Sequence, residues 1–150
     1  MRNLLLVAAI LGASSVAHAD PAPAKREVAI VAGGCFWGME NVMRDLPGVV
    51  SIEVGYAGGK STKVGYEDVS EGSTGHAESV RIVFDPSKIS YDDVLLRYFR
   101  GHDPTQLDRQ NNDIGSQYRS EIFTTTTTQD RKSTRLNSSH IQKSRMPSSA

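Results

Sequence analysis

A single cysteine is the residue of this chain best suited to covalent chemistry. Cys35 follows an apolar run (residues 28–32) and two glycines, and it precedes residues 36–45, whose apolar spacing predicts a helix. A thiol at the start of a helix faces unpaired backbone N–H groups and the positive end of the helix dipole, and both favour the thiolate. A lone cysteine is often only a small buried hydrophobe, but this context favours a nucleophile.

A carboxyl group is the second candidate for chemistry. Glu78 has the same parity as Val80, Ile82 and Phe84 in a predicted strand, so its side chain is expected on the buried face. Burial disfavours the ionised form, and such a carboxyl can act as a proton donor near neutral pH. If the strand begins later, Glu78 simply meets solvent, and that alternative stays open here.

Aromatic and acidic side chains supply the remaining candidates. Tyr66 and Tyr118 flank two long loops and carry phenol O–H groups that can donate to an oxygen, whereas Phe36 and Trp37 can form the wall of an apolar pocket beside the thiol. Asp113 can hydrogen-bond a substrate backbone. Each also has a plainer interpretation, as a packing aromatic or as a carboxylate that stabilises its own turn.

The elements that must position these residues follow a recognisable order. Alternating apolar residues predict strands, and wider apolar spacing predicts two main helices, the second opened by a Ser90 to Asp93 capping box. The order β-α-β-β-α-β is typical of a ferredoxin-like core, an α+β two-layer sandwich. The expected strands are 27–32, 50–56, 77–84 and 118–123, and the expected helices are 36–45 and a segment that begins near 91.

The N-terminal end predicts export. Arg2 precedes a short apolar stretch (residues 4–10), and small residues stand at the two positions that a signal peptidase reads in residues 17–19. We therefore predict a signal peptide at 1–19, a linker at 20–26, and a periplasmic or secreted protein. The apolar stretch is shorter than the roughly 20 residues that span a membrane, so no membrane association is expected after cleavage.

The C-terminal end predicts a different kind of segment. Residues 130–150 are rich in Ser, Lys and Arg and have no apolar periodicity, which predicts disorder. Codons for residues 130–140 and 144–150 fit a sequencing-library adapter and its continuation. We interpret 130–150 as a non-native tail, and 27–129 as one domain that is truncated at its C-terminus.

Charge and composition exclude several classes of site. The tail carries five basic residues and one acidic residue, so a chain of zero net charge has a net charge of minus four outside it. No basic patch then indicates nucleic-acid binding. With one cysteine, and with His76 and His102 as the only histidines of the body, a metal site is not expected.

Five motifs in order, from residue 28 to about 123, resemble the A-type peptide methionine sulfoxide reductases. They are GGCFWG (33–38), GYAGG (55–59), GHAE (75–78), HDPTQ (102–106) and NDIGSQYRS (112–120). The resemblance implies reduction of methionine S-sulfoxide, free or in proteins, as a repair of oxidative damage. It implies that Cys35 attacks the sulfoxide sulfur, that Glu78 donates a proton to the oxygen, and that Tyr66 and Tyr118 hydrogen-bond that oxygen.

The same resemblance assigns substrate binding and a reductant. Phe36 and Trp37 would hold the S-methyl group, and Asp113 would help to hold the substrate main chain. Cys35 would be left as a sulfenic acid. With no second cysteine in the chain, an external dithiol or a thioredoxin-like protein would have to reduce it, with no bound cofactor, and we expect a monomer.

Two other functions remain open from the sequence. A secreted cysteine hydrolase would pair Cys35 with His76 or His102 and would form an acyl-enzyme. An inactive fragment, or a module that binds oxidised methionine without turnover, would also retain the motifs. Trapping a sulfenic acid after exposure to methionine sulfoxide separates the first function from these two.

Overall fold

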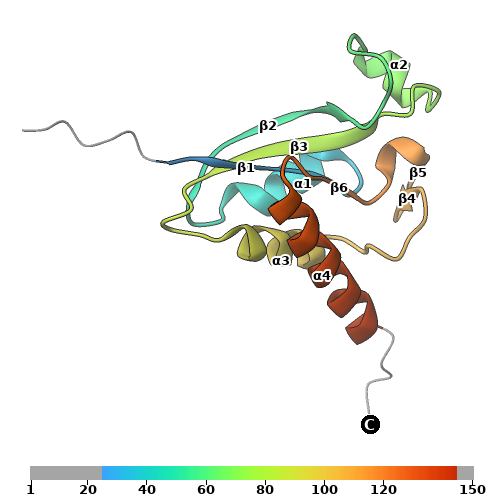
Figure 1. Cartoon of the computed structure of the whole chain (residues 1–150). Helices are drawn as coiled ribbons and strands as arrows, with labels where there is room; N and C mark the ends of the chain where they lie inside the picture. The colour runs from blue at the N-terminus through green and yellow to red at the C-terminus, as the bar shows by residue number, and fades with distance from the viewer. Residues whose placement is uncertain (1–24, 145–150) are drawn as a thin grey trace, which may run out of the picture.

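The computed structural model describes residues 25–144, and Figure 1 labels most of their helices and strands. The predicted signal peptide and most of the predicted linker lie outside these residues. In chain order the elements are β1 (Glu27–Ala32), α1 (Phe36–Arg44), β2 (Val49–Ala57), α2 (Tyr66–Ser70), β3 (Ala77–Phe84), α3 (Tyr91–Gly101), β4 (Arg109–Gln110), β5 (Asp113–Ile114), the 3₁₀ turn η1 (Ser116–Tyr118), β6 (Glu121–Phe123) and α4 (Thr127–Ser144).

Four strands form one sheet in the order β2-β3-β1-β6, with antiparallel pairing throughout. Helices α1 and α3 pack on each other and on the same face of this sheet, as Figure 1 shows. The chain leaves β1, forms α1 and re-enters the sheet as β2, on the far side of β3. It likewise leaves β3, forms α3 and re-enters as β6, on the far side of β1. The predicted ferredoxin-like α+β sandwich is therefore confirmed.

The core lies between that face and the two helices. Register places Val31 opposite Val80 and Ala29 opposite Ile82, and all four side chains are buried. Helix α3 adds a buried stripe at helical spacing, and its first turn has the predicted capping box, because Ser90 Oγ accepts from the N–H of Asp93 at 3.2 Å. The stripe is Tyr91, Val94, Leu95, Tyr98 and Phe99.

Strand β2 departs from strict alternation at its start. The register shifts between Val49 and Ser51, and Val50 is exposed. After this bulge, Ile52, Val54 and Tyr56 pair with the core-facing positions of β3. With this register, Tyr56 near the end of β2 lies opposite Glu78 of β3.

The predicted strand at 118–123 is wrong in its first half. Residues Ser116–Tyr118 form a 3₁₀ turn, in which the N–H of Tyr118 donates to Gly115 O at 3.0 Å, and only Glu121–Phe123 pair with β1. Gly115 has a φ of 141°, which favours glycine and starts the turn. The preceding loop also contains the β4-β5 hairpin, whose two-residue strands are too short to show periodicity.

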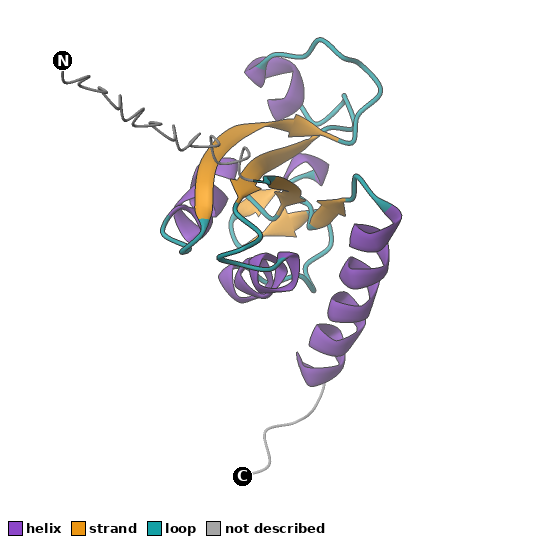
Figure 2. Cartoon of the chain, turned by 60° about the vertical axis from the view of Figure 1, so that its left-hand side comes forward, coloured by secondary structure: helices purple, strands orange, loops and turns teal. Residues whose placement is uncertain are grey.

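The predicted disorder of the C-terminal segment is wrong for residues 130–144, which continue α4 (Figure 2). Gln129 Nε2 donates to Val28 O at 2.8 Å, Ser133 hydrogen-bonds the hydroxyl of Tyr91, and Leu136 packs against the core. These three residues share one helix face. Because two of them are polar, the sequence has no apolar stripe that would predict the helix. The non-native origin of the segment stays a prediction.

None of the helices within residues 25–144 combines the length and the hydrophobicity that crossing a bilayer requires.

Candidate active site

Cys35 stands at the N-cap of α1, as predicted. The turn between β1 and α1 is tight, because Gly34 has a φ of 92° and a Cβ there would press on the Gln110 side chain. Tyr98 of α3 fixes the end of β1, since its hydroxyl donates to Ala32 O at 2.7 Å. The Cys35 side chain is partly buried and makes no capping hydrogen bond to its own helix. The side chain packs against the edge of the core, and its thiol is not engaged in capping the helix.

Glu78 faces the buried side of β3, as its parity predicted, and is only 3% exposed. Its Oε2 accepts a hydrogen bond from the backbone N–H of Phe36 at 2.9 Å, although the two residues are 42 positions apart. Burial raises the pKa of the Glu78 carboxyl, the Phe36 N–H opposes that shift, and the charge of Asp113 adds to it. The net direction is upward, which favours the protonated acid.

Two tyrosines lie near this carboxyl, Tyr56 opposite Glu78 on β2 and Tyr118 of η1. Burial raises the pKa of Tyr118, and the charges of Glu78, Asp113 and Cys35, with Tyr66, add to the shift. Burial likewise raises the pKa of Tyr56, and the charges of Glu78 and Tyr66 raise it further. Both phenols therefore remain O–H donors across the neutral range.

An aromatic cluster forms at the first turn of α1, directly after Cys35. The ring of Phe36 is buried and lies 5.2 Å from Trp37 and 5.7 Å from Tyr56, between ring centroids. Trp37 is 58% exposed and stacks on Tyr66 at 6.3 Å with an interplanar angle of 23°. These four rings form an apolar wall that is open to solvent at Trp37 and Tyr66.

A cavity of about 510 Å³ opens on Cys35 from the side of α1, the end of α3 and the β4-β5 hairpin. Asp113 lines it, together with Asn111, Asn112 and His102. Of the residues for which the sequence predicted chemistry or binding, Cys35 and Asp113 line this cavity. Outside its lining, Phe36 binds Glu78 through its N–H and Trp37 stacks on Tyr66. The charges of Cys35, Glu78 and Asp113 act on Tyr118, which relates it to all three.

The two histidines are engaged with main-chain groups. His76 is 5% exposed, its Nε2 lies 3.0 Å from Ser61 O, and its ring fills the space beside Gly59. His102 has Nδ1 at 2.8 Å from Tyr98 O, and its ring lies 4.2 Å from that of Tyr98. The His76 ring therefore contacts the loop after β2, and the His102 ring contacts the last turn of α3, which does not favour the hydrolase pairing.

Sequence reasoning missed Tyr56 as a site residue. The alternating pattern predicts Tyr56 only as part of a strand. The β2-β3 register places it directly opposite Glu78. Pairing the two predicted strands as a hairpin would have found it.

Sequence reasoning also missed the residues on either side of Tyr118. Gln117 is buried and donates to Ser70 O at 3.0 Å, at the end of α2. Arg119 donates to Ser116 O at 2.9 Å, to Gly75 O at 3.2 Å and to the Glu121 carboxylate at 2.6 Å. No sequence pattern indicates Ser70 O and Gly75 O as partners, because these are main-chain groups of distant segments.

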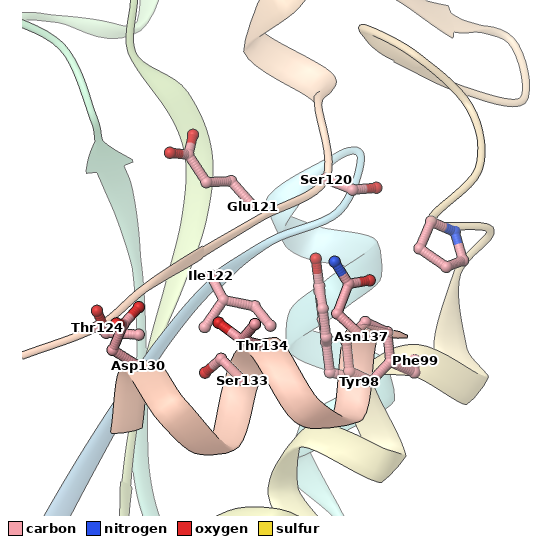
Figure 3. Close-up of a pocket in the computed structure, with 11 residues that line it drawn as sticks. Tyr98, Phe99, Ser120, Glu121, Ile122, Thr124, Asp130, Ser133, Thr134 and Asn137 are labelled. Carbon is pink, nitrogen blue, oxygen red and sulfur yellow. The ribbon is translucent and has the colours of Figure 1, made fainter. Parts of the chain in front are cut away.

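A second cavity, of about 260 Å³, lies between β6, α3 and α4 (Figure 3). Tyr98 and Ser120 face it from the domain, and Asp130 and Asn137 face it from α4. None of the residues predicted for the site lines it. Within residues 25–144, no group of three or more His, Cys, Asp or Glu side chains is placed to hold a metal ion.

Comparison with known proteins agrees with the motifs. The family model described as peptide methionine sulfoxide reductase matches residues 27–149. Peptide methionine sulfoxide reductase MsrA of Salinispora arenicola is 52% identical over 108 residues, which are 72% of this chain and 49% of that protein. The chain thus spans about half the length of the curated relatives that it matches.

Solved structures show the same fold. Mxr1 from Saccharomyces cerevisiae in its reduced form has a TM-score of 0.77 and 32% identity, covering 83% of this chain and 73% of that one. Mxr1 in complex with Trx2 has a TM-score of 0.59 and 25% identity, covering 85% and 74%. This chain belongs to the peptide methionine sulfoxide reductase family.

Proposed function

We propose that this chain reduces methionine S-sulfoxide, free or in proteins, to methionine. Cys35 attacks the sulfoxide sulfur as the thiolate, and the protonated Glu78 carboxyl gives its proton to the sulfoxide oxygen. The oxygen then moves from the substrate sulfur to the Cys35 sulfur: a sulfur–oxygen bond forms on Cys35, while the substrate sulfur–oxygen bond and the bond between the two sulfurs break. The substrate sulfur is thereby reduced by two electrons, and Cys35 is oxidised to the sulfenic acid.

One contact carries this proposal. The hydrogen bond from the Phe36 N–H to Glu78 Oε2, at 2.9 Å, holds a buried carboxyl against the turn that presents Cys35. In this proposal the sulfoxide group binds between the Cys35 thiolate and the Glu78 carboxyl. Tyr66 and Tyr118 are then donors to the oxygen on which negative charge develops, which stabilises the transition state.

The surrounding groups suit the substrate. An S-methyl group is small and apolar, and the rings of Phe36 and Trp37 offer it a matching surface. The Asp113 carboxylate, at the edge of the cavity, can accept from the substrate main chain. Neither contact requires a bound cofactor.

We also propose an external thiol as the reductant. Cys35 is the only cysteine of the chain, so a dithiol must attack the sulfenic sulfur, release water, and then resolve the mixed disulfide with its own second thiol. The structure of Mxr1 with Trx2 supports a thioredoxin-like protein in this role.

The experiment is a single turnover of each epimer of methionine sulfoxide without reductant. We expect one methionine per chain from the S epimer only, and a Cys35 that a sulfenic-acid reagent labels in the mass spectrum. An acyl adduct on Cys35 after an ester or amide substrate would identify a hydrolase instead. Binding of the sulfoxide without turnover in excess dithiol would indicate a non-catalytic module.

Export remains part of the proposal. The basic residue, the short apolar stretch and the small residues of 17–19 support it. N-terminal sequencing of the protein from the periplasm should begin at Asp20, whereas a cytoplasmic protein that retains Met1 would contradict export.

A further inference from the structure

Gln117, next to Tyr118, reaches the helix that carries Tyr66. Its side chain is 6% exposed, and its Nε2 donates to Ser70 O at 3.0 Å across 47 positions. Ser70 in turn donates from Oγ to Tyr66 O at 2.7 Å. A hydrogen-bonded path therefore runs from the neighbour of one phenol to the main chain of the other.

Helix α2 depends on such contacts for its position. It has five residues, and a helix that short is not stable by itself in water. Its own buried side chain is Val69, which is 1% exposed. At its other end, Tyr66 stacks on the exposed ring of Trp37. The Gln117 amide therefore adds a hydrogen bond that joins the end of α2 to η1, besides the burial of Val69 and the stacking of Tyr66.

The main chain approaches the Gln117 amide from two sides. A Cβ at Gly115 would overlap Oε1, and one at Gly72 would lie 3.2 Å from it. Both glycines have positive φ, 141° and 75°. Among the described residues, Oε1 is buried without a hydrogen-bond partner. A buried oxygen without a hydrogen-bond partner lowers the free energy of unfolding. The stability of the fold alone therefore does not explain why position 117 carries an amide side chain.

We propose that Gln117 is a positioning residue that sets Tyr66 relative to Tyr118, so that both phenols donate to one sulfoxide oxygen. The proposal rests on the proposed function and deepens it. Gln117 does not itself contact the substrate. It acts through Ser70, and its effect should depend on the phenol of Tyr66.

The test is Gln117→Met, which keeps the length of the side chain and removes the amide. Ser70 is exposed, so water can replace the lost donor and the fold should persist. We expect kcat/KM for methionine S-sulfoxide to fall about tenfold, as one of two donors is misplaced. Acrylamide should also quench Trp37, the only tryptophan, more strongly, because Tyr66 no longer covers it.

Two controls separate positioning from a general structural role. In a Tyr66→Phe background, Gln117→Met should cause little further loss of kcat/KM, since the phenol that it positions is gone. Gln129→Met makes the same substitution at another buried glutamine, in the first turn of α4, whose Nε2 donates to Val28 O at 2.8 Å. It should change neither kcat/KM nor the quenching of Trp37.

The outcomes are distinguishable. A wild-type chain without sulfoxide reduction overturns the proposed function, and Trp37 quenching still tests the placement of α2. An active wild type with an equally active Gln117→Met, or an undiminished loss in the Tyr66→Phe background, overturns the positioning role. If Gln117→Met does not fold, Ser70→Ala removes the next hydrogen bond of the path at the surface, and unchanged quenching of Trp37 would then overturn it.

Discussion

Glu78 is subject to opposing influences that together suit a proton donor. Burial raises the pKa of its carboxyl, and the N–H of Phe36 lowers it without cancelling the shift. The same N–H fixes the direction of the carboxyl. A glutamine in its place can still accept that hydrogen bond, but it has no acidic proton to transfer, so it separates geometry from acid chemistry.

Glu78→Gln should therefore lower kcat/KM for methionine S-sulfoxide by roughly 100-fold or more, the usual contribution of a general acid. Alkylation of Cys35 by iodoacetamide should continue, because the turn around it is intact. The control is Glu53→Gln, an exposed carboxylate of β2 that pairs with Arg81 and should not affect turnover. Equal turnover in wild type and Glu78→Gln would remove Glu78 from the mechanism.

The pH dependence follows from the direction of the same shift. Because the pKa of Glu78 lies above its ordinary value of 4.5, the proton is retained to higher pH, and kcat/KM should fall as pH rises through the raised pKa. Stopped-flow single turnovers across this range measure that limb. Glu78→Gln should lack it, and a descending limb of the same shape in the variant would assign the titration to another group.

At the level of single residues, sequence reasoning succeeded where local periodicity was decisive. Parity placed Glu78 on the buried face, and the Gly-Gly turn placed Cys35 at a helix start. Tyr56 and Gln117 were missed because their importance depends on which distant segment lies opposite them. Strand register and main-chain partners are not encoded in a local pattern.

Among the elements, α3 carries one side of the core and illustrates why capping could be predicted. Ser90 and Asp93 exchange hydrogen bonds between side chains and main-chain N–H groups, which satisfies two donors that a helix end leaves unpaired. The stripe behind this cap is apolar and regular. By contrast, η1 and the β4-β5 hairpin are set by backbone geometry in polar segments, and periodicity does not detect them.

Ser90→Ala should lower the free energy of unfolding by about 1 kcal/mol, the usual value of a lost N-cap. Urea unfolding followed by circular dichroism measures it. The same substitution at Ser138, an exposed residue inside α4, removes no cap and should not lower stability. If both variants unfold with wild-type midpoints, the capping box does not stabilise α3 in solution.

Across the whole molecule, the site and α4 lie on different parts of the fold. The residues of the proposed site are held by β1, α1, α2, β3 and η1. Helix α4 instead packs on α3 and projects past the domain at its C-terminal end (Figures 1 and 2). Its contacts join it to the domain through Val28, Tyr91 and Asp92. The helix should therefore contribute to stability without contributing to chemistry.

A chain that ends at Thr126 tests this separation. Loss of the Gln129 and Ser133 hydrogen bonds and of Leu136 packing should lower the free energy of unfolding by about 3 kcal/mol, measured in urea. The rate constant of a single turnover, per folded molecule, should stay at the wild-type value. Asn137→Ala, an exposed change on the same helix, should alter neither quantity. Coincident urea transitions for the shortened and full chains would contradict the packing of α4. A smaller single-turnover rate constant in the shortened chain would show that α4 supports the site through α3.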